Sequence, residues 1–174
     1  MMELSIRESS VHGEGIFTDC DLKENDVIPI ENNVIMTEKR EEMLKDVNRD
    51  FVILILSGPV LEAWFLIFHI LSLDEIPTWF SNLHRNTDLR KEMGELDKAI
   101  LKKCFELYYK SKNVMEVFDI VVTNFLKGSN ETYYISEMTS KLNHNNDNNV
   151  LTFIENKTLI IKAIRDIKAG EELY

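Results

Sequence analysis

The stretch of sequence nearest the C-terminus, residues 163–173, reads AIRDIKAGEEL. Asp166–Gly170 has the composition of a turn, and it leads into the paired carboxylates Glu171 and Glu172. Paired carboxylates can act as acid and base, but they then need a partner such as a histidine or a metal ion. No such partner is evident in the sequence around them, so the residues alone favour a solvated turn before a last short strand.

Strand-forming residues gather at both ends of the chain. Asn156-Lys157 separates two β-type runs, residues 150–154 and 159–164, which predicts a hairpin. Tyr133-Tyr134-Ile135 marks the point where strands return after the middle of the chain. Further strands are predicted around residues 4–6, 15–18, 27–30 and 34–36.

The middle of the chain changes to helical spacing. One helix is predicted from Glu38, and Pro59 suits the first turn of a second helix. A third is predicted from about Thr87, and a fourth spans Val114–Leu126 and stops before Gly128. The residues expected to face inward are Met43, Leu44, Val47 and Phe51 in the first helix, Leu61, Trp64, Phe65 and Phe68 in the second, and Met93, Leu96, Ile100, Cys104, Leu107 and Tyr108 in the third.

Length and charge narrow the class of protein. The chain has 174 residues, of which 44% are hydrophobic and 29% charged, the balance of one globular domain. Its formal net charge is −10, which argues against direct nucleic-acid binding because that binding needs clustered lysine and arginine. The acidity suits a basic partner better, such as a lysine-rich peptide.

Neither the long apolar segment nor the cysteines indicate a membrane protein, a disulfide-bonded secreted protein or a zinc protein. Phe51–Leu73 is long and largely apolar, but Ser57-Gly58-Pro59 interrupts it and Glu62 lies inside it. We therefore expect two buried helices and no membrane span. Cys20 and Cys104 are the only cysteines and no secretory leader precedes them, so we expect reduced cysteines, no zinc cluster and no other metal site.

Three local patterns could bind a ligand. His12-Gly13-Glu14-Gly15 is a turn whose glycines permit a close backbone approach, although such turns also make ordinary hairpins. Asn143-His144 offers an amide that can both donate and accept, or else it satisfies the backbone of a turn within a solvated run of residues 143–149. Asn124 on an apolar helix face is either a helix-end cap or a ligand contact.

Taken together and in order, these patterns resemble one family, the SET-domain protein-lysine methyltransferases. The resemblance is carried by residues 10–17 (SVHGEGIF), 21–28 (DLKENDVI), 142–144 (LNH) and 163–173. The SET-and-MYND branch is the most similar, on the basis of residues 123–125 (TNF), residues 140–144 (SKLNH) and a helical insert. The resemblance covers about residues 3–36 and 115–173.

The resemblance implies a fold and a division of the chain. The fold would be an α+β SET-type β-clip, with small curved sheets, a knot-like C-terminal crossing of the Asn143 segment and a large helical insert. One SET-like domain would span residues 1–174. Its N-terminal strands would lie in residues 1–37, the insert in residues 38–127 and the C-terminal strands in residues 128–174.

The resemblance also implies an activity, which is transfer of a methyl group from S-adenosylmethionine to a lysine side chain of a histone or non-histone protein. His12, Gly13 and Glu14 would hold the methionine end of the cofactor through their backbone. Asn143 would bind its amino-acid part and His144 the adenine edge, while Asn124 would contact it from the insert. Tyr133 and Tyr134 are candidates for the catalytic lysine channel, or else strand aromatics of the core. The protein would be intracellular, in the nucleus or cytoplasm, and its oligomeric state is not predicted.

The chain departs from the family pattern at two places. Residues 145–148 (NNDN) replace the family's Ser-Cys-x-Pro, and two cysteines cannot build a MYND zinc module. The family places its catalytic tyrosine a few residues beyond the Gly-Glu-Glu-Leu block, whereas the sequence stops at Tyr174. A truncated, weakly active domain is one expectation. A non-catalytic SET-like module that binds S-adenosylmethionine or a peptide is the alternative, and an α-helical interaction scaffold would leave both ends unexplained.

Overall fold

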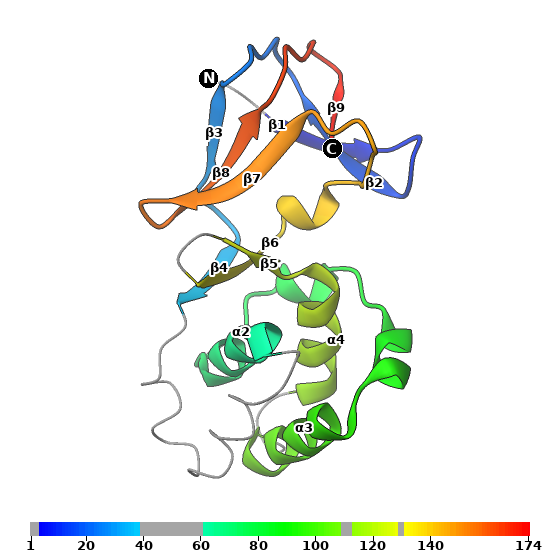
Figure 1. Cartoon of the computed structure of the whole chain (residues 1–174), viewed down its shortest axis with the longest axis vertical. Helices are drawn as coiled ribbons and strands as arrows, with labels where there is room; N and C mark the ends of the chain where they lie inside the picture. The colour runs from blue at the N-terminus through cyan, green and yellow to red at the C-terminus, as the bar shows by residue number, and fades with distance from the viewer. Residues whose placement is uncertain (1–3, 39–60, 109–112, 129–130) are drawn as a thin grey trace. The chain divides into compact units, whose positions relative to one another are not determined.

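The structure is a computed structural model that describes residues 4–38, 61–108, 113–128 and 131–174 (Figure 1). It divides into two compact units, residues 1–34 with 136–174 and residues 35–135. Across the described ranges, no helix is both long enough and apolar enough to cross a bilayer. That the whole of residues 1–174 forms one domain stays a prediction.

The first unit joins the two ends of the chain in small antiparallel sheets. One sheet has the order β1-β2-β9 and the other the order β3-β8-β7. Both sheets combine strands from the first 30 residues with strands from the last 25, so the ends depend on each other for their hydrogen bonds. The strands are β1 (Leu4–Glu8), β2 (Glu14–Thr18), β3 (Val27–Ile30), β7 (Val150–Glu155), β8 (Thr158–Ala163) and β9 (Glu172–Leu173).

The hairpin predicted around Asn156-Lys157 is confirmed. Strands β7 and β8 pair along their full length, from Val150 with Ala163 to Glu155 with Thr158. Asn156 and Lys157 have φ angles of 50° and 65°. A two-residue turn whose twist matches that of the flanking strands requires a positive φ at both of its central residues. Asn tolerates that conformation, whereas Lys carries a steric cost there.

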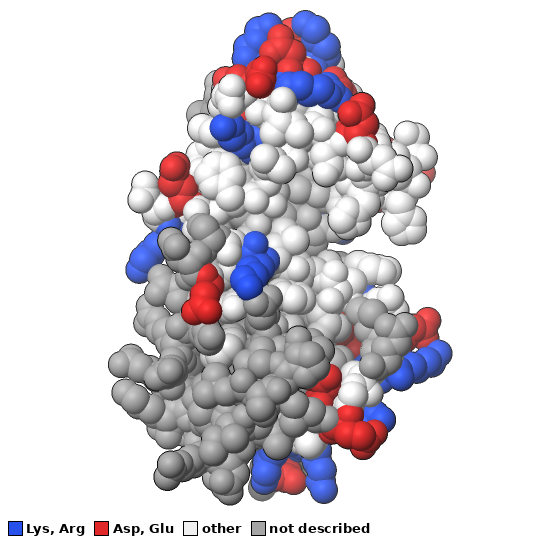
Figure 2. All heavy atoms as spheres, viewed as in Figure 1, with Lys and Arg blue, Asp and Glu red and all other residues white. Residues whose placement is uncertain are grey.

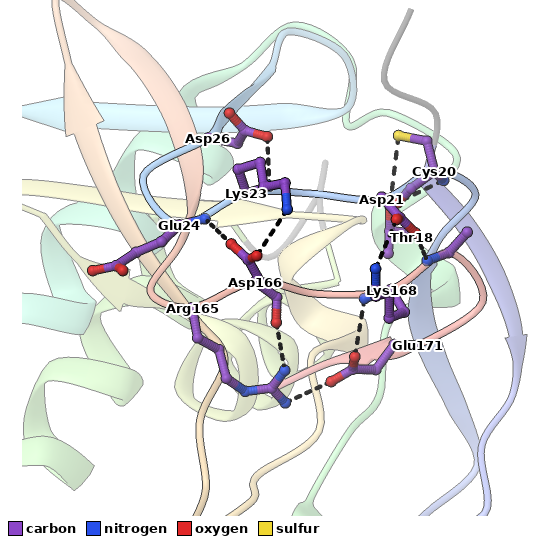
Figure 3. A network of polar contacts seen from close by, with 11 residues as sticks. Thr18, Cys20, Asp21, Lys23, Glu24, Asp26, Arg165, Asp166, Lys168 and Glu171 are labelled. Carbon is purple, nitrogen blue, oxygen red and sulfur yellow. Dashed lines mark hydrogen bonds and ion pairs between the residues drawn. The ribbon is translucent and has the colours of Figure 1, made fainter.

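Charged side chains connect the turn of residues 19–26 with the turn of residues 165–171 (Figure 3). Lys168 Nζ lies 3.0 Å from Asp21 Oδ2, and Lys23 Nζ lies 2.9 Å from Asp166 Oδ2. Asp21 also accepts from the Ala169 N–H, and Asp166 from the Glu24 N–H. Within the second turn, Glu171 pairs with Arg165 at 2.5 Å (Figure 3). In the space-filling view, positive and negative side chains alternate at this end of the first unit (Figure 2).

The second unit is mainly helical. Its helices are α2 (Leu61–Ser72), α3 (Glu95–Tyr108) and α4 (Val114–Asn124), with short 3₁₀ helices at Phe80–Asn82 and Thr87–Glu92. A third sheet of order β4-β6-β5 consists of β4 (Val34–Glu38), β5 (Leu126–Lys127) and β6 (Thr132–Ser136). The division between the units passes through β4 and β6.

The core of the second unit forms around α2 and α4. Trp64, Phe65 and Phe68 are buried as predicted, and Trp64 packs on Phe118 with ring centroids 5.4 Å apart. The Trp64 indole N–H donates to the buried Asp97 Oδ1 at 3.2 Å, so the largest side chain of the core also has its polar atom satisfied.

Three details of the third and fourth predicted helices are wrong. The predicted helix from Thr87 is split, because Met93 is extended and Gly94 follows it, so that α3 starts only at Glu95. Leu107 is 54% exposed although Ile100 and Cys104 are buried. The fourth helix ends at Asn124, and Leu126 lies in β5, because residues 126–127 pair with residues 133–134 of β6 and the Gly128 N–H donates to the Thr132 carbonyl.

Some predictions fall outside the described residues. They are the inward orientation of Met43, Leu44, Val47 and Phe51 in the first helix, the place of Pro59 in the first turn of the second, and the inward orientation of the Leu61 and Leu96 side chains. The predicted start of the first helix at Glu38 is wrong, because Glu38 is the last residue of strand β4.

The β7–β8 turn yields a stability prediction. Replacing Lys157 with Gly should raise the free energy of unfolding by about 1 kcal/mol, because Gly has no Cβ to oppose a positive φ. Chemical denaturation of the wild type and the variant measures this difference. Lys157→Ala is the matched control, since it removes the same side chain but keeps the Cβ; an equal gain from Ala would show that backbone strain is not the cause.

The network in Figure 3 yields a pH prediction. The Ala169 N–H and Lys168 lower the pKa of Asp21, Lys23 lowers that of Asp166, and Arg165 lowers that of Glu171. A lowered pKa in the folded state gives stability that is present above the unfolded value and is lost as pH falls through the folded value. The melting temperature should therefore drop as pH falls below about 4, the ordinary range of these carboxyls.

The Asp166→Asn variant should show a smaller drop in melting temperature over the same pH range. Glu155→Gln is the control, because Glu155 lies exposed at the end of β7, away from the network. Identical acid profiles for Asp166→Asn and Glu155→Gln would contradict a role for the network.

Candidate functional site

The loop between β1 and β2 has a defined shape because of two local hydrogen bonds. The Ser9 N–H donates to the Gly13 carbonyl at 2.8 Å, and the Ser9 hydroxyl accepts from the Val11 N–H at 2.9 Å. Gly13 has a φ angle of +53°, which explains why glycine stands there. His12, Gly13 and Glu14 are exposed, so the loop predicted to bind a ligand is open to solvent.

Asn143 is brought to this loop from a distant part of the sequence. Its Nδ2 donates to the Glu14 carbonyl at 3.2 Å and to Glu172 Oε1 at 2.8 Å. Nearby, Lys141 Nζ lies 2.7 Å from Glu14 Oε2. The Asn143 segment is therefore held against both β2 and β9, and the structure brings Glu14 and Asn143 together.

Glu172 is the centre of these contacts. It is only 6% exposed, and besides Asn143 its carboxylate accepts from the Ser9 hydroxyl at 2.8 Å and the Tyr174 hydroxyl at 3.2 Å. A Cβ added to Gly15 would overlap the Glu172 carboxylate. Gly15 is thus required because the Glu172 carboxylate packs directly against its Cα, and not because its φ angle is positive.

The end of the Asn-rich run has a structural role that sequence analysis missed. Residues 144–148 are exposed, as a solvated loop should be, but Asn149 is fully buried. Its Nδ2 donates to the Glu172 carbonyl at 2.7 Å, and its Oδ1 accepts from the Tyr174 N–H at 2.8 Å. No local feature of the Asn-rich run sets Asn149 apart from its neighbours.

Ser9 and Glu172 were also missed as site residues. Ser9 immediately precedes the block of residues 10–17 that carries the resemblance. Glu172 has the sequence context of one half of a solvated carboxylate pair. Glu171, by contrast, does lie in the turn and pairs with Arg165. Only the folded chain separates the two neighbouring carboxylates, because Glu171 stays in the turn whereas Glu172 enters β9 and is buried.

The carboxylate of Glu172 also affects Tyr174. Burial raises the pKa of the Tyr174 phenol, and the negative charge of Glu172 raises it further. A tyrosine with a raised pKa keeps its proton near neutral pH. The Tyr174 hydroxyl therefore acts as a hydrogen-bond donor to Glu172.

The polar atoms left at this site define which ligand it could hold. The backbone N–H groups of His12 and Gly13 donate to no acceptor among the described residues. Both donors of the Asn143 amide are in use, and its remaining polar atom is the acceptor Oδ1. Two N–H donors for a carboxylate and one acceptor for an ammonium group fit a ligand that ends in an amino acid.

Three predicted site residues lie in the other unit. Asn124 Nδ2 donates to the Ile120 carbonyl at 2.8 Å and to the His84 carbonyl at 2.7 Å, so both of its N–H donors are used at the end of α4. Tyr133 and Tyr134 are buried in β6, where Tyr133 stacks on Phe65 with ring centroids 6.1 Å apart. Their roles toward a ligand, like those of His12, Gly13, Glu14, Asn143 and His144, stay predictions.

A metal centre finds no support in the described part of the chain. No group of three or more His, Cys, Asp or Glu side chains is arranged there to hold an ion. Cys104 is buried, and burial raises the pKa of its thiol to about 12, so it is a poor thiolate ligand.

Comparison with known families identifies the class of protein. The family model of the SET domain matches residues 13–174, and the chain therefore belongs to the SET-domain family. The predicted fold class, an α+β SET-type fold of small antiparallel sheets with a helical part, is confirmed. None of the curated proteins compared with the chain matches it.

Solved structures with some similarity include a candidate histone methyltransferase from Plasmodium falciparum. It is 14% identical with a TM-score of 0.41, and the match covers 99% of this chain and 90% of that one. Rubisco LSMT is also similar, in complexes with sinefungin and monomethyllysine (TM-score 0.47) and with AdoMet (TM-score 0.48). In both, identity is 14%, and the match covers 98% of this chain but 47% of the Rubisco LSMT chain.

The packing of Gly15 against Glu172 yields a prediction. Gly15→Ala should lower the free energy of unfolding by about 2 kcal/mol or more, because the new methyl group would displace a buried, hydrogen-bonded carboxylate. Gly13→Ala should cost only about 1 kcal/mol, since that position has open space and merely an unfavourable φ. Urea denaturation of both variants tests the order, and a larger loss from Gly13→Ala would refute the packing argument.

Proposed function

We propose that this protein binds S-adenosylmethionine and transfers its methyl group to a lysine side-chain amine of a protein substrate. Membership of the SET-domain family supports the class of reaction. The observation that carries the proposal is the convergence of the Ser9–Glu14 loop with Asn143, 129 positions further along the chain than Glu14. Together they offer the donors and the acceptor that the amino-acid end of the cofactor needs.

The cofactor would be held by residues of the first unit. The backbone of His12, Gly13 and Glu14 would take its carboxylate, Asn143 its amino group and His144 its adenine edge. Asn124, from α4, is a further proposed contact. When bound, S-adenosylmethionine supplies an electrophilic methyl group on a positively charged sulfur.

The protein's main task is then to prepare and position the lysine. A free lysine amine has a pKa of about 10.4 and is protonated at neutral pH. A narrow apolar channel next to a positive charge lowers that pKa, so neutral amine can form without a strong general base. Positioning of the two reactants contributes the rest of the rate enhancement. Tyr133 and Tyr134 are the proposed channel residues.

The finer parts of the proposal concern substrate and family branch. The net charge of −10 suits a lysine-rich protein or peptide, histone or non-histone. Residues 123–125 and 140–144 support the SET-and-MYND branch, without a MYND zinc module. We propose an intracellular site of action, in the nucleus or cytoplasm.

Cofactor binding by the wild type and by Asn143→Ala tests the proposal. The variant should bind S-adenosylmethionine about tenfold or more weakly, because it loses a hydrogen bond to a charged group. Isothermal titration calorimetry measures the affinity. Asn146→Ala is the matched control, since Asn146 is an exposed residue of the same run, and it should bind like the wild type.

Transfer of radiolabelled methyl groups to mixed histones and to lysine-rich peptides then tests the reaction. Label on lysine, reduced in Asn143→Ala but not in Asn146→Ala, is the expected result. Binding of the cofactor without any transfer would favour the alternative, a non-catalytic SET-like binding module. No binding at all would refute the proposed function.

A further inference from the structure

The Glu172 carboxylate is buried without a cationic partner among the described residues. Its three side-chain contacts are with Ser9, Asn143 and Tyr174, and all three are uncharged donors. A buried carboxylate is costly unless hydrogen bonds compensate its loss of water. Three uncharged donors compensate the buried carboxylate of Glu172, which lies on the two-residue strand β9. Such an arrangement indicates that the carboxylate has a specific role.

One consequence concerns the orientation of the Asn143 amide. Both groups that face its Nδ2, the Glu14 carbonyl and the Glu172 carboxylate, can only accept hydrogen bonds. If the amide were turned over, Oδ1 would face two acceptors and both contacts would become repulsive. The carboxylate therefore holds the amide with Nδ2 toward Glu14 and Glu172, and Oδ1 is the atom available to a ligand.

The same carboxylate also holds the neighbouring loop. Ser9 donates its hydroxyl proton to Glu172 Oε2, and the Ser9 hydroxyl oxygen accepts from the Val11 N–H. The Ser9 N–H closes the loop on the Gly13 carbonyl. One side chain on β9 thus orients both the amide acceptor and the loop that carries the free N–H donors.

We propose that Glu172 is a positioning residue that fixes the Asn143 amide so that Oδ1 receives the α-ammonium group of the cofactor. This inference rests on the proposed function, because it presumes a ligand with an amino-acid end. Glu172 does not touch the ligand itself. It acts by turning Asn143 Oδ1, a hydrogen-bond acceptor, toward the place where the ammonium group should bind. It also holds the Ser9–Gly13 loop where the N–H groups of His12 and Gly13 can reach the ligand carboxylate.

The test compares two ligands that differ only in the ammonium group. S-adenosylhomocysteine has the α-amino group, and its deamino analogue keeps the carboxylate, thioether and adenosine. Glu172→Gln should weaken S-adenosylhomocysteine about tenfold, because the amide of Asn143 can then turn over and a hydrogen bond to a charged group is lost. Its affinity for the deamino analogue should be unchanged, because the amide oxygen of the variant side chain can still accept from the Ser9 hydroxyl and so keep the Ser9–Gly13 loop in place. Calorimetry or fluorescence titration gives both values.

Glu171→Gln is the matched control, since Glu171 is the adjacent carboxylate and pairs with Arg165 instead of Asn143. It should bind both ligands as the wild type does. Equal weakening of both ligands by Glu172→Gln would show that Glu172 only maintains the fold. Unchanged affinity for both would show that it does not orient Asn143. Either outcome overturns the inference and leaves the proposed function intact.

A second variant keeps the test decisive if Glu172→Gln does not fold. Asn143→Ala leaves the Ser9 and Tyr174 hydroxyls to satisfy Glu172. It should bind S-adenosylhomocysteine and the deamino analogue with equal affinity, whereas the wild type prefers the former. A preference that survives in Asn143→Ala would assign the ammonium contact to another residue. If the wild type binds neither ligand, the proposed function fails, and this inference fails with it.

Discussion

The first unit of this SET-domain protein depends on one buried carboxylate that is held by uncharged groups. Glu172 collects hydrogen bonds from Ser9, Asn143 and Tyr174 while it lies against Gly15. Ser9 and Glu172 are 163 positions apart, so this one contact brings together the two ends of the chain. Because an uncompensated carboxylate in that position would be costly, the three donors together keep Glu172 in its buried position.

Two further sets of interactions hold the same ends together, and they differ in kind. The sheets β1-β2-β9 and β3-β8-β7 satisfy backbone groups, and the ion pairs between residues 19–26 and 165–171 lie at the surface. Exposed ion pairs contribute little individually and weaken in salt or acid. The sheets and the hydrogen bonds of Glu172 with Ser9, Asn143 and Tyr174 therefore position the site residues. The surface ion pairs add a part of the stability that depends on pH.

The chemistry that we propose is consistent with a site that positions and does not exchange protons. Among the described residues of the first unit, no basic side chain is paired with the buried carboxylate next to Asn143. That carboxylate, Glu172, accepts hydrogen bonds from Ser9, Asn143 and Tyr174 and so fixes their orientation. Methyl transfer from a sulfonium to a neutral amine demands alignment and exclusion of water more than proton transfer. A carboxylate that sets the direction of an amide suits such a reaction.

The sequence by itself determined the local elements and the family. Alternating apolar residues, the Asn156-Lys157 turn and the blocks at residues 10–17 and 163–173 predicted the strands, the hairpin and the SET domain, because each signal lies within a few neighbouring positions. Helical spacing did not predict two helix ends, because Gly94 interrupts the third helix and strand β5 follows the fourth. Only the tertiary structure decided that Glu172 is buried and Glu171 is not, that Asn149 joins β9 while Asn145–Asn148 remain exposed, and that Ser9 belongs to the site. Those outcomes depend on contacts between residues far apart in the chain, and no local pattern of residue types encodes which distant donor will reach a given carboxylate.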